Sequence, residues 1–200
     1  MQKTQNKTHL LFVYTVFSCI FFIIGLTLCY VLPIDSYVYK GLEDTLINSI
    51  VGTNGLSLFR LSDIIPSFLC EAKYVIFILF ASFTKYREIL FPFFVSFKGF
   101  VVGISVACLM RSIKYGNLDA SYGFLCCSVF VILSVCLILV ICWLCATSSI
   151  YSNRLIYPLR LNLIIKRKDT YNFLLDFLAV CGALLIIVFL KIGNFSLMIS

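Results

Sequence analysis

The stretch Ser121–Ala146, SYGFLCCSVFVILSVCLILVICWLCA, decides the fold class of this chain because it contains no charged residue. A hydrocarbon core about 30 Å thick is crossed by roughly 20 residues of α-helix, so this stretch predicts a transmembrane helix. The composition agrees: 62% of the 200 residues are hydrophobic, 12% are charged, and the mean hydropathy is +1.05. Soluble domains carry about 25% charged residues. We therefore expect a single integral membrane domain, residues 1–200, with an all-α helical bundle.

Further apolar runs bring the expected number of membrane helices to about five. The second run is the weakest, because Glu71 and Lys73 lie near its start and the uncharged part, Tyr74–Thr84, is too short to span alone. It either includes the preceding turns or forms a re-entrant hairpin with the third run. The first run is interpreted as an uncleaved signal anchor, because it exceeds the 7–15 apolar residues of a signal peptide. The expected spans are 10–32, 65–84, 89–110, 121–146 and 173–192.

The distribution of charge predicts the orientation of these spans. Lys and Arg accumulate in cytoplasmic loops. With the N-terminus inside, the inner segments hold nine cations and two acidic residues, whereas the outer segments hold six of each. We therefore expect an N-in, C-out topology with an outer loop at 33–64 and a basic inner loop at 147–171. A re-entrant hairpin on the outer side would leave this charge pattern unchanged.

Each of these two loops has a distinct pattern. In the outer loop, Leu56–Phe68 places its leucines and isoleucines near one face of a helix, which suits packing on the protein's own spans or on a partner. In the inner loop, a basic cluster is expected to bind anionic lipid headgroups at about 1 kcal/mol per cation. Nucleic-acid binding is not expected beside two spans. The cluster comprises Arg160, Lys166, Arg167 and Lys168.

Two ionisable residues within the expected spans, Lys98 and Asp176, are the sharpest chemical signals. A charge at mid-membrane costs a few kcal/mol, so such residues are functional hypotheses by default. Helical side chains tilt toward the N-terminus of their helix, and both helices would start inside, so Lys98 could reach Asp176. We expect an ion pair holding the third span to the fifth. Snorkelling of Lys98 to the headgroups and an ion relay are the alternatives.

Small residues follow Lys98 at every fourth position: Gly99, Gly103 and Ala107. Such a face lets another helix approach closely. Packing within the chain is the expected use, and a homo-oligomer is the alternative.

No catalytic, cofactor-binding or metal-binding residues are predicted, so we do not expect an enzyme. The ten cysteines lie mostly in the expected spans, where cysteine behaves as a small apolar residue. His9 is the only histidine, and the chain contains no P-loop, G-x-S-x-G or G-x-G-x-x-G motif.

The run Phe97–Val106, FKGFVVGISV, resembles the F/L-K-G-x-V-V-G-x-x-V signature of the stage II sporulation protein M family. Pro92 before it, the long outer loop after the first span, and the basic inner loop followed by Tyr171 occupy similar places in that family. The family usually has a small-residue break between its second and third spans, whereas this chain has Lys85-Tyr-Arg-Glu88. Asp176 is not part of the family pattern.

The resemblance implies a non-enzymatic scaffold in a bacterial cell membrane. Such a scaffold would recruit or anchor two peptidoglycan-remodelling proteins, stage II sporulation proteins D and P, at the septal membrane during engulfment in endospore formation. The alternative function is a small transporter, or the membrane subunit of one, with Lys98 as an intramembrane ligand.

Overall fold

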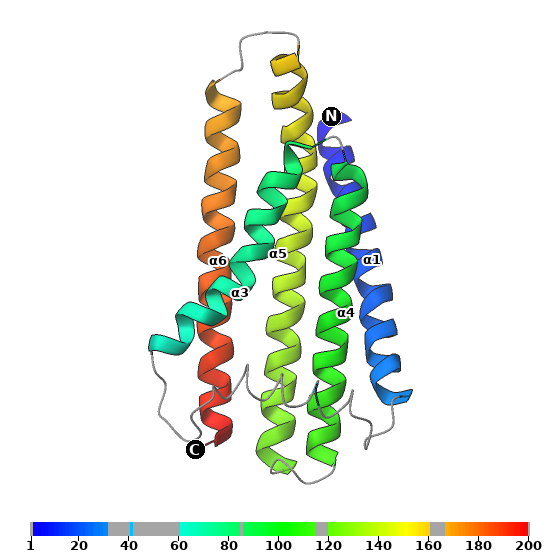
Figure 1. Ribbon diagram of the computed structural model, residues 1–200, viewed down its shortest axis with the longest axis vertical. Coiled ribbons are helices and arrows are strands. Elements are labelled where there is room, and N and C mark those ends of the chain that lie inside the picture. Colours follow the sequence, from blue (N-terminus) through cyan, green and yellow to red (C-terminus); the bar gives the residue numbers. More distant parts are fainter. Residues whose placement is uncertain are drawn as a thin grey trace.

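A computed structural model describes residues 2–31, 41, 61–84, 86–114, 120–160 and 167–199, and every element in these ranges is a helix. Four helices run roughly along the long axis of the molecule and a fifth, α3, crosses them obliquely (Figure 1). The predicted all-α helical bundle is therefore confirmed. The helices are α1 (Gln2–Val31), α3 (Leu61–Ser82), α4 (Arg87–Lys114), α5 (Ala120–Arg160) and α6 (Arg167–Ile199).

Within the described residues, four helices are long and apolar enough to cross a membrane. At a rise of 1.5 Å per residue, the 25-residue candidate spans are about 37 Å long, more than the hydrocarbon core requires. Both α5 and α6 extend into the expected inner loop. No glycine lies between Gly123 and Gly182, and within α5 no proline precedes Pro158, so no helix-breaking residue ends α5 earlier. The four candidate spans are Lys7–Val31, Arg87–Arg111, Cys127–Tyr151 and Tyr171–Leu190.

Helix α3 is not one of these four, although it covers residues 65–82 of the expected second span, 65–84. It is continuous from Leu61 to Ser82, so the apolar Tyr74–Thr84 stretch does include the preceding turns. The turn that joins α3 to α4 lies at the same end of the bundle as the N-terminus (Figure 1). Residues 32–40 and 42–60, most of the expected outer loop, lie outside the described residues.

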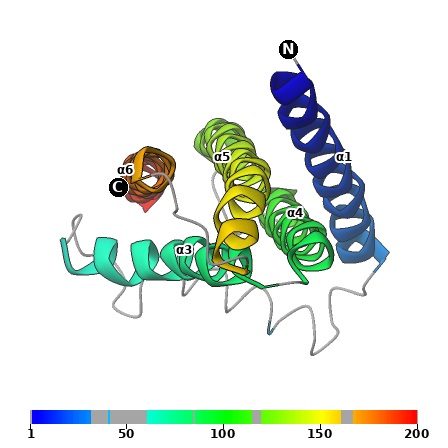
Figure 2. The same ribbon diagram turned by 90° about the horizontal axis from the view of Figure 1, so that it is seen from above.

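Helix α5 occupies the centre of the bundle, where it contacts α1, α3, α4 and α6. Its side chains Leu137 and Leu144 are completely buried. Seen from above, α4 and α6 lie on opposite sides of α5, and α3 runs along one side of the bundle (Figure 2). The most extensive contact between two described helices is that of α1 with α4.

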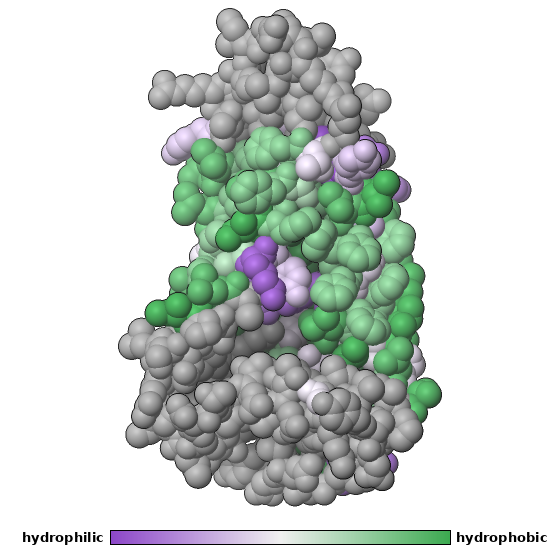
Figure 3. Space-filling view, viewed as in Figure 1, coloured by the Kyte–Doolittle hydropathy of each residue, from purple (hydrophilic) through white to green (hydrophobic). Residues whose placement is uncertain are grey.

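The outer faces of the helices are as apolar as the core. On α6, Phe173, Phe177 and Leu184 are buried, while Leu178 on the opposite face is 69% exposed. A helix that is apolar all round belongs in a large core or in a membrane. The space-filling view shows the same apolar surface over the middle of the described part (Figure 3). The helices therefore fit a multi-pass membrane protein whose outer surface faces lipid.

Candidate functional site: an intramembrane ion pair beside a glycine-packed helix pair

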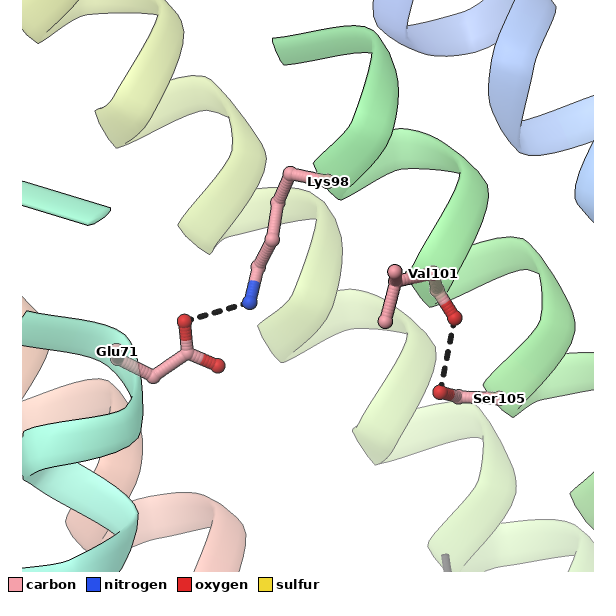
Figure 4. A network of polar contacts seen from close by, with 4 residues as sticks. All are labelled: Glu71, Lys98, Val101 and Ser105. Atoms are coloured by element: carbon pink, nitrogen blue, oxygen red, sulfur yellow. Dashed lines mark hydrogen bonds and ion pairs between the residues drawn. The ribbon is translucent and has the colours of Figure 1, made fainter. Parts of the chain in front are cut away.

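Lys98 lies close to the middle of the candidate span Arg87–Arg111 of α4, and its side chain is only 7% exposed. Its Nζ atom donates a hydrogen bond to Oε2 of Glu71 on α3 over 2.6 Å, and the Glu71 side chain is 16% exposed. Figure 4 shows the lysine side chain extending from α4 toward α3 to meet the carboxylate. Each charge thus satisfies the other at a depth where an isolated charge costs several kcal/mol.

An aromatic ring completes this site. The Nζ atom of Lys98 lies 4.5 Å from the centre of the Tyr74 ring, within the range of a cation–π contact. Lys73, which is exposed, also approaches this ring, with its Nζ 5.5 Å from the ring centre. We call Glu71, Lys73, Tyr74 and Lys98 the polar cluster. A hydrophilic patch interrupts the apolar surface where α3 crosses the bundle (Figure 3).

The expected ion pair between Lys98 and Asp176 is corrected by this geometry. Asp176 lies on α6, which packs against α5 and α3, whereas Lys98 lies on α4 at the opposite side of α5. The lysine side chain also runs toward the level of Val101 rather than toward the N-terminus of its helix (Figure 4). The direction of the Lys98 side chain is therefore determined by its flexible stem and by the nearby Glu71 carboxylate rather than by the general tilt of helical side chains.

Gly99 and Gly103 lie where α4 crosses α1. A Cβ atom at Gly99 would collide with the carbonyl oxygen of Ser18, and one at Gly103 with that of Phe22. Gly25 of α1 is packed against α4 in the same way, because a Cβ there would collide with the carbonyl oxygen of Phe100. The two backbones are in direct contact, so the small-residue face is occupied by a helix of the same chain.

At the far end of the same interface, Arg111 of α4 holds the end of α1. Its Nη1 donates to the carbonyl oxygen of Cys29 over 2.7 Å, and its Nη2 donates to that of Tyr30 over 3.1 Å. The last carbonyls of a helix have no partner within the helix, and a cation there also interacts favourably with the helix dipole. Ala107 is completely buried in a small apolar cluster with Cys29 and Cys108.

At the opposite end, polar groups join α1 to α5. The hydroxyls of Tyr14 and Ser149 are hydrogen bonded over 3.2 Å, and Nζ of Lys7 lies 4.4 Å from the centre of the Trp143 ring. Such amphipathic side chains are typical of the membrane–water interface.

The predicted basic cluster is divided between two helices. Arg160 ends α5, Arg167 and Lys168 begin α6, and Lys166 lies outside the described residues. The described residues contain no group of three or more His, Cys, Asp or Glu side chains that could hold a metal ion.

Sequence reasoning did not find the roles of Glu71, Arg111 and Gly25. In the sequence, Glu71 only interrupts a weak span; an acidic residue in one span and a lysine in the next are the signal that could have identified the pair. Arg111 contributes to the sequence interpretation only as one of the outer cations. Gly25 carries no local signal, because a lone glycine in an apolar run gives no indication of the helix that packs on it.

Comparisons with protein-family models, with curated proteins and with solved structures give no match.

Proposed function

We propose that this chain is a non-enzymatic membrane scaffold: a multi-pass helical bundle that holds partner proteins at the membrane. The observation that carries the proposal is the pairing of Lys98 with Glu71. The positive charge of Lys98 is satisfied within the chain, and its side chain is almost fully buried. A structural ion pair of this kind joins α3 to α4 within the bundle.

The same observation weighs against the transporter alternative. An anion ligand at Lys98 would have to displace the Glu71 carboxylate, whose Oε2 lies 2.6 Å from Nζ. The negative charge of that carboxylate would also repel the anion.

The finer assignment comes from the resemblance to the stage II sporulation protein M family. It is supported by the Phe97–Val106 motif, whose Lys98, Gly99 and Gly103 have definite packing roles in the bundle. The scaffold would then lie in the cell membrane at the division septum of a spore-forming bacterium, N-terminus inside. Its partners would be stage II sporulation proteins D and P, bound to the outer side during engulfment.

The test compares the wild type with the double variant Glu71→Leu/Lys98→Met, which removes both charges and keeps apolar volume. Each full-length chain is tagged, expressed in a spore-forming host, extracted in mild detergent and purified by its tag. The scaffold predicts that peptidoglycan-remodelling proteins co-purify with both chains, and that a fluorescent fusion of each collects at the septum.

Two results would overturn the proposal. One is co-purification of no peptidoglycan-remodelling protein with the wild type, with no enrichment at the septum. The other is solute flux in proteoliposomes that the wild type supports and the double variant loses, because a scaffold conducts no solute through a site at position 98.

A further inference from the structure

We propose that Cys29 and Cys108 form a disulfide bond that joins α1 covalently to α4. Their Sγ atoms lie 3.4 Å apart although the residues are separated by 79 positions in the sequence. Cys29 is 0% exposed and Cys108 2% exposed, and they pack together in one small cluster with Ala107. This inference goes beyond the scaffold role and does not depend on it.

Contacts on both sides of the pair fix the distance between the two sulfurs. One turn before Cys29, Gly25 brings the backbone of α1 against Phe100 of α4. One turn after Cys108, Arg111 donates to the carbonyl oxygen of Cys29 itself over 2.7 Å. A disulfide has an S–S distance of about 2.05 Å, so the sulfurs must approach by roughly 1.4 Å. The proposal requires rotation of the two side chains to supply this approach.

The cysteine pair lies at the end of the bundle that the predicted topology places on the outer side of the membrane. Cys29 lies in the last turn of α1, which ends at the end of the bundle opposite the N-terminus (Figure 1). With the N-terminus inside, as the excess of inner cations predicts, this end faces the outer side of the membrane. Disulfides form and persist in such extracytoplasmic environments, whereas cytosolic thiols are kept reduced.

The oxidant is a thiol oxidoreductase that carries a reactive disulfide. The thiolate of one cysteine attacks a sulfur of that disulfide and releases one thiolate of the oxidoreductase. The second cysteine then attacks the mixed disulfide, which forms the Cys29–Cys108 bond and releases the second thiolate. The two thiol protons and two electrons end on the oxidoreductase, which leaves as a dithiol. Because both cysteines are buried in the finished bundle, this exchange precedes the closure of α1 against α4.

The experiment counts disulfide-bonded cysteines in the full-length chain. Membranes from expressing cells are quenched in acid, free thiols are blocked with N-ethylmaleimide in SDS, and disulfides are reduced and labelled with a maleimide-linked polyethylene glycol. We expect two polymer tags on the wild type and none on Cys29→Ser or Cys108→Ser. The matched controls are Cys19→Ser and Cys136→Ser, which replace exposed cysteines and should retain two tags.

Mass spectrometry of the unreduced wild type keeps the test decisive if a serine variant fails to fold. A cross-linked peptide pair containing Cys29 and Cys108 supports the proposal. Recovery of both peptides as N-ethylmaleimide adducts overturns it, as does retention of two tags in both serine variants.

Discussion

Among the described helices, two that precede α4 in the chain contact it, and these two contacts are built on opposite principles. Against α1, the backbones touch at Gly25, Gly99 and Gly103, where a single methyl group has no room. Against α3, the contact is less extensive, and an ion pair between long side chains bridges the gap. One contact depends on the absence of side chains and the other on their reach.

The comparison shows how helices associate where the hydrophobic effect does not act between them. Lipid tails are as apolar as leucine, so burial of apolar surface gives no preference for a helix over lipid. Close backbone packing and satisfied polar groups remain as driving forces. Helix α1 is apolar enough to span by itself and uses the first, whereas α3 carries charges that must be satisfied and uses the second.

The largest effect is expected from Gly103→Leu. The new side chain would meet the carbonyl oxygen of Phe22, a backbone atom that cannot rotate away, so α1 and α4 would separate along their length. We expect no monodisperse protein on size-exclusion chromatography in detergent. The control is Gly182→Leu, where the new Cβ would meet no atom of another helix within 4 Å and the elution profile should not change. A normal profile for Gly103→Leu would show that the two helices are not in backbone contact.

A smaller but still large effect is expected when the ion pair is broken from one side. Glu71→Leu leaves the Lys98 ammonium buried without its counter-charge, and we expect a loss of about 3–5 kcal/mol in the free energy of unfolding. The measurement is SDS-induced unfolding from mixed micelles.

The double variant Glu71→Leu/Lys98→Met should regain most of this loss, because neither charge remains. Lys73→Met, which removes an exposed cation of the polar cluster, is the control and should change stability little. Equal destabilisation in the single and double variants would contradict the pairing.

Loss of the arginine that holds the end of α1 should be of intermediate size. Arg111→Gln removes a charge-assisted hydrogen bond to each of two carbonyl oxygens, and we expect about 2 kcal/mol in the same unfolding assay. Lys114→Gln, an exposed cation one turn further along α4, serves as the matched control. If the two variants unfold at the same SDS fraction, the contact with α1 contributes nothing measurable.

The smallest effect is expected at the hydroxyl pair of α1 and α5. Tyr14→Phe removes only the hydrogen bond to Ser149, and such bonds between membrane helices average about 0.6 kcal/mol. Tyr86→Phe changes an exposed residue and should have no effect. A loss above about 2 kcal/mol at Tyr14 would mean that the hydroxyl belongs to a larger network.

The sequence was informative about α1, α4, α5 and α6 because long, predominantly apolar runs with few charges have one interpretation in a bilayer. It was ambiguous about α3, where Glu71 and Lys73 fall inside the helix and the uncharged part is short. The sequence alone cannot resolve this ambiguity, because only the tertiary structure shows that Lys98 lies opposite Glu71 and neutralises its charge.

The candidate site shows the same limit. Lys98 could be identified from its position within a span, but its partner depended on which helices are neighbours. The sequence allows spans three and five to meet, whereas in the structure α5 lies between α4 and α6. Likewise, the periodicity of Gly99, Gly103 and Ala107 predicted a close approach of helices, but no local pattern could name α1 as the helix that approaches.

The contact of α1 with α4 cannot form during biosynthesis until α4 has been synthesised. Gly25 touches the backbone at Phe100, so 75 residues separate the two sides of one backbone contact. At about 5–20 residues per second, a ribosome takes roughly 4–15 seconds to cover that interval. During this time α1 must reside in the bilayer or the translocon with its glycine face turned toward lipid or a chaperone. Nascent chains arrested before α4 should therefore expose this face to a membrane-soluble cross-linker, and chains arrested after α4 should not.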